Sequence, residues 1–178
     1  MSRFARLLRA IILEGTDKMG RRIFAIVITA LSLTFLAVAA GAATGKSAVG
    51  SWKLDLGKSS YEKMAAPAGE KLVVMTDKPD AIKWLLTGAT SDGKTYVSMY
   101  EGPVDGQAHP YGNNAVGNTI SYMRSPSGLE WTVKDKNGAV IEMGVGQVSA
   151  DGNTLTIKGS TVTPNGKGNF VSVFDRVQ

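Results

Sequence analysis

From Val49 to the end of the chain, short segments rich in β-branched and aromatic residues alternate with clusters of Gly, Pro, Asn and Asp. No window of about eleven or more residues in this region shows a helical period of apolar residues. The region is therefore predicted to be all-β, with nine strands. The predicted strands are 50–56, 70–76, 81–88, 95–101, 118–124, 128–134, 139–148, 154–162 and 169–176.

The segments between these strands carry residues suited to tight reversals. Asp92-Gly93, Asn137-Gly138 and Asp151-Gly152 place glycine where a short hairpin turn needs a positive φ. Short turns make strands that follow one another in the sequence neighbours in space, which predicts an antiparallel meander.

Two connections are longer, 57–69 and 102–117. In the first we expect one helical turn around 61–65, which Pro67 stops from growing. The second holds four glycines and two prolines, so we expect an irregular surface loop.

The number of strands bears on whether the sheet closes into a barrel. An antiparallel sheet of this size with two free edges would expose unpaired backbone groups, and closing it into a barrel removes them. Closure by antiparallel pairing alone needs an even count, so one of the nine predicted strands is extra, bent between two partners or miscounted. We predict a single up-and-down barrel of eight to nine strands. At about eight strands, side chains fill the interior or leave room for one small ligand.

The N-terminal part has the pattern of a secretory signal peptide. The uncharged stretch 23–40 follows Arg21-Arg22 and ends in small residues of the A-x-A type. A start at Met19 would give a signal of ordinary length. We therefore assign 1–42 to an N-terminal extension and signal peptide and 43–178 to the barrel, and we expect a periplasmic or secreted protein.

Two alternatives to this assignment stay open. An apolar stretch of 18 residues is at the short end of what spans a bilayer, so its length also suits a retained membrane anchor. The cleavage patterns favour removal. The arginine pair also partly matches a twin-arginine export signal. Contact with a membrane is expected only through this segment, if it is not cleaved.

The charge of the chain is concentrated in the predicted leader. The whole chain has 20 Lys and Arg, 15 Asp and Glu and a formal net charge of +5, but residues 1–42 hold six basic and two acidic residues. The remainder is nearly neutral, which removes the electrostatic argument for a nucleic-acid partner. With no cysteine and His109 as its single histidine, the chain offers neither disulfides nor an evident metal site.

The two ends of the predicted barrel resemble those of a known group. Gly50-Ser51-Trp52 opens the first strand, and Phe174-Asp175-Arg176 ends the last. A G-x-W motif on the first strand, covered by an arginine from the last, resembles the lipocalin and wider calycin barrels. This resemblance implies a structural role for Trp52 and Arg176, with the guanidinium stacked on an indole that plugs one end of the barrel.

A closer likeness covers nearly the whole chain after the leader. The stretches GSWKLDLGKSSY, SADGNTLTIKGS and VFDR, with the corner Tyr100-Glu101-Gly102 followed by Pro110-Tyr111-Gly112, are similar to a family of small secreted bacterial lipocalin-like proteins. The resemblance implies a fold and a compartment and no settled activity. One departure is the insertion 106–109, which lengthens the corner.

Aromatic residues on the predicted strands are the candidates for a binding site, because ligand pockets combine aromatic walls with a few polar groups. The candidate ligand-binding residues are Trp84, Tyr96, Tyr100, Tyr122, Trp131 and Phe170, with Ser98, Glu142 and Ser172 as polar contacts. The opposing interpretation is that these rings fill the barrel, which the low aromatic content of 7% favours.

No catalytic constellation is visible, so a binding module is favoured over an enzyme. His109, with Asp105 and Glu101 near it in the sequence, is expected to be exposed and inert. We predict no cofactor and no metal.

The favoured function is a monomeric, exported carrier of a small hydrophobic or amphipathic molecule, with the loop 102–117 as a lid at one mouth. The alternative is a secreted protein-binding module, such as an inhibitor of an extracellular enzyme, acting through exposed loops. An open apolar cavity would favour the carrier, and a packed core the inhibitor.

Overall fold

The computed structural model describes residues 45–112, 117–164 and 166–177, so the predicted leader 1–42 lies outside the described residues. The described regular structure consists of β-strands, and no helix occurs in these ranges. Accordingly, none of the described segments is a helix of the length and hydropathy that crossing a membrane requires. The all-β prediction is confirmed.

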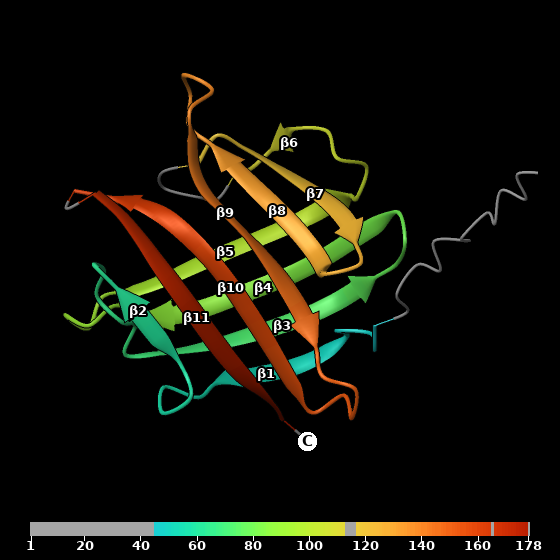
Figure 1. The fold of residues 1–178 in the computed structure, drawn as a ribbon, viewed down its shortest axis with the longest axis horizontal. Helices are drawn as coiled ribbons and strands as arrows, with labels where there is room; N and C mark the ends of the chain where they lie inside the picture. Colours follow the sequence, from blue (N-terminus) through green and yellow to red (C-terminus); the bar gives the residue numbers. More distant parts are fainter. Residues whose placement is uncertain (1–44, 113–116, 165, 178) are drawn as a thin grey trace, which may run out of the picture. The chain divides into compact units, whose positions relative to one another are not determined.

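The described strands form one antiparallel sheet of eleven strands that curls into a nearly closed barrel (Figure 1). The spatial order is β5-β4-β3-β1-β11-β10-β9-β8-β7-β6, and β2 pairs with β11. The strands are β1 (Gly50–Leu54), β2 (Ser60–Glu62), β3 (Gly69–Asp77), β4 (Ala81–Ala89), β5 (Thr95–Pro103), β6 (His109–Pro110), β7 (Thr119–Ser125), β8 (Gly128–Lys134), β9 (Val140–Val148), β10 (Thr154–Thr163) and β11 (Gly166–Val177).

The predicted strand count is wrong, because two short strands lie in the long connections. β2 occupies the place where a helical turn was expected. The reason is a difference in length: β11 has 12 residues and β1 has five, so β1 pairs only with the C-terminal part of β11. The free backbone further back on β11 pairs with β2, where Tyr61 lies opposite Phe170. The two-residue strand β6 pairs with the start of β7 in the same way.

The barrel also differs from the prediction in its closure. In the described part of the chain β5 pairs only with β4, and β6 only with β7, which leaves a seam between β5 and the β6–β7 pair. Tyrosine rings occupy this seam: the ring centroid of Tyr100 lies 5.1 Å from that of Tyr122 and 6.5 Å from that of Tyr111. Contacts between these rings therefore join the two edges where no strand ladder does.

Two buried clusters stabilise the barrel. Both follow from strand alternation; in β1, for example, Trp52 and Leu54 are buried and Lys53 is exposed. The first cluster consists of Trp52, Leu54, Leu72, Val74, Leu155 and Phe174. The second, beside the seam, consists of Ile82, Tyr100, Tyr111, Ile120, Tyr122 and Val133.

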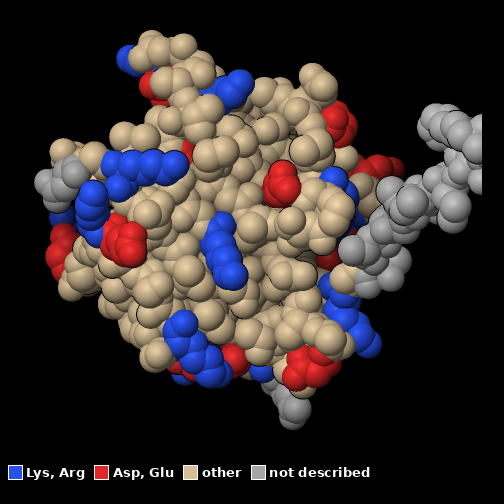
Figure 2. Space-filling model, viewed as in Figure 1, with Lys and Arg blue, Asp and Glu red and all other residues tan. Residues whose placement is uncertain are grey.

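The outer face formed by β9, β10 and β11 mixes both signs of charge. In Figure 2, acidic and basic side chains are interspersed around the edge of this face, and neither sign gathers into an extended region on it. Some apolar side chains on it are exposed, among them Met143 and Val162.

Candidate functional site

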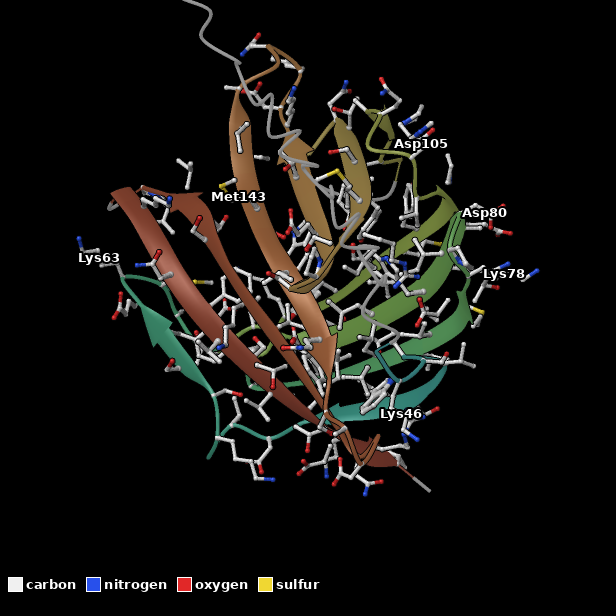
Figure 3. The ribbon with its side chains drawn as sticks, turned by 45° about the vertical axis from the view of Figure 1, so that its right-hand side comes forward. Lys46, Lys63, Lys78, Asp80, Asp105 and Met143 are labelled. Atoms are coloured by element: carbon white, nitrogen blue, oxygen red, sulfur yellow. The ribbon has the colours of Figure 1, made fainter. Side chains whose placement is uncertain are left out.

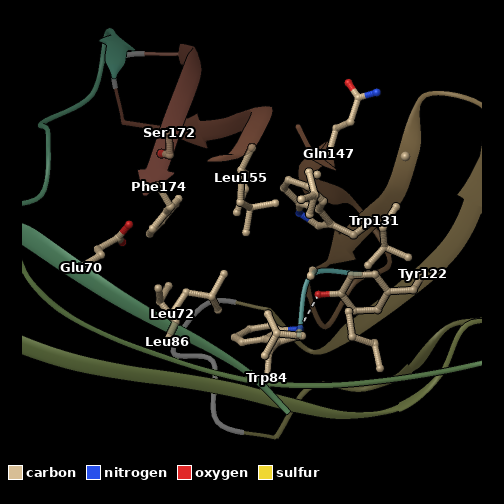
Figure 4. A pocket seen from close by; sticks show the side chains of 18 of the residues that line it. Glu70, Leu72, Trp84, Leu86, Tyr122, Trp131, Gln147, Leu155, Ser172 and Phe174 are labelled. Carbon is tan, nitrogen blue, oxygen red and sulfur yellow. Dashed lines mark hydrogen bonds between the residues drawn. The ribbon is translucent and has the colours of Figure 1, made fainter. Parts of the chain in front are cut away.

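The barrel contains a cavity of about 930 Å³. This volume lies in the range of about 300–1,000 Å³ that is usual for small-molecule sites. Figure 4 shows side chains from facing walls pointing into the open space. The apolar part of the lining includes Leu72, Val74, Ile82, Leu86, Ile120, Leu129, Leu155, Ile157 and Phe174. The interior is therefore not filled by its own rings.

The structure brings five of the six candidate aromatic residues to the cavity wall: Trp84, Tyr96, Tyr122, Trp131 and Phe170. Tyr100 is not among the lining residues. It is 5% exposed and lies in the seam, between Tyr111 and Tyr122. Tyr111, quoted above only for the family resemblance, lines the cavity instead.

Three of the lining rings lie against the wall because each faces a glycine on the next strand. The opposite pairs are Tyr96 with Gly88, Trp131 with Gly144, and Phe170 with Gly159. A Cβ atom on any of these glycines would lie 2.5–2.7 Å from the facing ring, closer than real contacts allow. Each ring thus occupies the volume of a missing side chain, and the centre of the barrel stays open.

A hydrogen bond crosses the interior near the seam. The indole Nε1 of Trp84 on β4 donates to the hydroxyl oxygen of Tyr122 on β7 at 2.9 Å, shown as the dashed line in Figure 4. Burial raises the pKa of Tyr122 well above its ordinary value of 10.0, so the phenol stays protonated. Arg124 adds a second link across the seam, since its guanidinium donates to Asp77 and to the carbonyl oxygen of Lys78.

Three carboxyl groups line the cavity, and one of them, Asp77, accepts from Arg124. Glu70 Oε1 accepts a hydrogen bond from the Tyr96 hydroxyl, and Glu142 Oε1 accepts one from Trp131 Nε1 at 3.1 Å. Burial raises the pKa of both glutamate carboxyls above the ordinary value of 4.5. Beside Glu70, the hydroxyls of Tyr61 and Ser172 are hydrogen-bonded at 2.9 Å.

Glu142 and Ser172 were candidate polar contacts, and both line the cavity, whereas Glu70 was missed. The sequence carries a sign of its position, because strand alternation places Glu70 on the same face as Leu72 and Val74. Ser98 does not line the cavity; its hydroxyl is hydrogen-bonded to that of Tyr111 at 2.7 Å.

The described part of the 102–117 connection packs over the seam. Val104 contacts the cluster beside the seam, and Tyr111 is buried in it. His109 does not line the cavity, and its Nε2 is hydrogen-bonded to Asp105 Oδ1 at 2.9 Å. Residues 113–116 lie outside the described ranges, and the role of this connection as a lid stays a prediction.

Trp52 and Arg176 lie together, apart from the cavity lining. The guanidinium carbon of Arg176 is 4.1 Å from the centroid of the Trp52 ring. Arg176 also donates to the carbonyl oxygens of Gly152 and Val49, at 2.6 and 2.7 Å. The pair therefore joins the start of β1, the end of β11 and the β9–β10 turn.

The raised pKa of Glu142 predicts how stability depends on pH. The folded protein holds this proton more tightly than the unfolded chain, so the free energy of unfolding should fall as the pH rises from about 4.5 through the raised pKa. Glu142→Gln keeps an oxygen that can accept from Trp131 and removes the charge. We expect this variant to melt at a higher temperature than the wild type at pH 8 and at nearly the same temperature at pH 4.

Melting temperatures of both proteins between pH 4 and 8 test this expectation. Glu101→Gln is the matched control, because the Glu101 side chain is 64% exposed and the same charge is removed outside the cavity. An equal shift of both variants, or no gain for Glu142→Gln at pH 8, would show that the buried carboxyl costs no stability.

Comparison with known proteins finds a remote structural likeness. No protein-family model matches the chain, and no curated protein does. Among solved structures, the chain is similar to zebrafish ileal bile acid-binding protein in complex with cholic acid, at a TM-score of 0.43 and 10% sequence identity, over 72% of this chain and 98% of that chain. A likeness of this degree assigns neither a family nor a ligand, and the lipocalin-like resemblance stays a prediction.

Proposed function

We propose that this protein binds a small hydrophobic or amphipathic molecule inside its barrel, as an exported, lipocalin-like binding module of the cell envelope. The cavity of about 930 Å³ carries this proposal. Its lining combines aliphatic and aromatic side chains with a few hydrogen-bonding groups, which is the composition of small-molecule sites.

The energetics favour an apolar body on the ligand. Transfer of apolar surface from water contributes roughly 25 cal/mol per Å², or about 0.8 kcal/mol for each buried CH₂ group. The rings of Tyr96, Trp131 and Phe170, which lie against the barrel wall, offer broad apolar contact to a ligand without moving. The polar groups then fix the orientation of the bound molecule.

Export and location in the envelope rest on the sequence of 1–42, namely the uncharged stretch after Arg21-Arg22 and the A-x-A patterns that follow it. Native mass spectrometry of the protein purified from its own envelope fraction tests both parts of the proposal at once. We expect a chain shortened by the leader, and an additional mass of a small molecule that is lost on denaturation.

A titration with a hydrophobic fluorescent dye tests binding directly. Trp84 and Trp131 line the cavity and Trp52 does not, so a bound dye should quench most of the tryptophan emission. Trp52→Phe is the control, since it keeps both cavity tryptophans and should show the same dissociation constant. Absence of quenching in the folded protein at saturating dye, together with no co-purifying molecule, would exclude the carrier function.

The alternative of a loop-mediated inhibitor predicted a packed core, and the cavity argues against it. It would regain support from a stoichiometric complex with an extracellular enzyme that forms equally well when the cavity is occupied by dye.

A further inference from the structure

Two of the three cavity carboxyls, Glu70 and Glu142, lie toward the same end of the barrel, and the third, Asp77, lies at the other end, paired with Arg124. β3 and β9 run in the same direction, because neighbours along β3-β1-β11-β10-β9 are antiparallel. Glu70 and Glu142 both lie near the beginning of their strands, at the end where β4 turns into β5. We call this the β4–β5 end. The close-up in Figure 4 shows Glu70 reaching into the open space near Ser172.

The basic side chains that line the cavity lie at the opposite, β3–β4 end. They are Lys46, Lys78 and Arg124, and Figure 3 shows Lys46 and Lys78 on the side away from Lys63 and Met143. Arg124 is already engaged by Asp77 and the Lys78 carbonyl. Among the described residues that line the β4–β5 end, the ionisable groups are Glu70, Glu142, Tyr61 and Tyr96, with no basic residue.

Each of these two carboxyls has one oxygen that receives no hydrogen bond from a described residue. The hydrogen bonds from Tyr96 and Trp131 go to Oε1 of Glu70 and Glu142, and no described residue bonds either Oε2. Neither Oε2 is a fully enclosed atom without a partner, so each has some accessible surface. The hydrogen bonds place the polar edges of two aromatic rings, Tyr96 and Trp131, beside the carboxyl groups.

This environment discriminates between head groups. An ammonium donates hydrogen bonds to a carboxylate. It also supplies the opposite charge that lets a buried carboxyl ionise. A carboxylate or phosphate head would meet oxygen acceptors and like charge instead, and a neutral head gains no ion pair.

We infer that the molecule held in the cavity is an amphipathic cation, with its apolar body along the barrel and an ammonium-type head between Glu70 and Glu142 at the β4–β5 end. This inference rests on the proposed function, and it names the chemical class of the ligand.

Three probes with the same twelve-carbon tail separate the possibilities: dodecylammonium, dodecanol and dodecanoate, each competing with the dye at pH 7 below its micellar concentration. We expect dodecylammonium to bind at least about tenfold more tightly than either of the others. In the double variant Glu70→Gln with Glu142→Gln, that advantage should disappear. Dodecanol should still bind there through its apolar tail, which also shows that the variant is folded.

The outcomes that overturn the inference differ from those that overturn the proposed function. Equal affinities for the three probes, or a preference for dodecanoate that is lost on Lys46→Gln, would place the head group elsewhere and refute the cationic ligand alone. Retention of the dodecylammonium advantage in the double variant would refute it as well. Failure of all three probes and of the dye would refute binding in the barrel altogether.

Discussion

Replacement of Trp52 by alanine is expected to lower the free energy of unfolding by about 3–5 kcal/mol, the usual cost of removing a large buried aromatic side chain. Trp52 is fully buried in the first core cluster. Its Nε1 donates to the carbonyl oxygen of Ala48 at 2.8 Å, and Arg176 covers its ring. Loss of the indole leaves a void in this cluster and a guanidinium that has lost its stacking partner.

Urea denaturation measures this cost, and dye binding separates a structural role from a functional one. Trp52 does not line the cavity, so the folded fraction of Trp52→Ala should bind dye with the affinity of the wild type. Trp52→Phe, which keeps a ring at this position, should recover part of the lost stability. If dye affinity dropped while the unfolding midpoint stayed in place, the tryptophan would belong to the binding site and not to the scaffold.

The sequence was sufficient to predict the nine longer strands, because they are bounded by turn residues and several are marked by clear alternation. In β8, Trp131 and Val133 face inward while Thr132 between them is polar, and Asn137-Gly138 then reverses the chain. These are local patterns, and the pairing of successive strands follows from the short turns that join them.

The two short strands and the seam depend on distant partners. β2 forms because β1 leaves part of β11 unpaired, and β6 forms against the start of β7. A segment of two or three residues carries no period of its own. The seam depends on where three tyrosine rings meet, which is a property of the assembled barrel.

For the same reason, the sequence did not show whether the interior of the barrel is packed or open. The aromatic residues were identified, but whether they fill the barrel depends on what lies opposite each ring. The register places Gly144 opposite Trp131 and Gly159 opposite Phe170, and register is set by pairing across strands. Glu70 begins the predicted strand 70–76 and was missed, although alternation with Leu72 and Val74 places it on the inward face.

Replacement of Gly144 by alanine is expected to lower the free energy of unfolding by about 1–3 kcal/mol, as overpacking of a filled site does, and to weaken dye binding. The added Cβ would lie 2.4 Å from the Lys158 carbonyl oxygen and 2.5 Å from the Trp131 ring. The backbone of β10 cannot easily retreat, because it is paired with β9 and β11. The ring is the group that can move, and the free space beside it is the cavity.

Gly146→Ala is a closely matched control, since Gly146 lies two residues further along β9, also lines the cavity, and has Leu129 O as its nearest atom at 4.0 Å. There the methyl group fits, and restriction of the unfolded chain should leave stability unchanged or raise it by up to about 1 kcal/mol. Denaturation and dye titration of both variants measure the difference, and the emission of Trp131 reports a displaced ring. Equal behaviour of the two variants would mean that the glycines do not hold the rings against the wall. A loss confined to Gly144→Ala would show that a missing side chain on β9 keeps the binding space open.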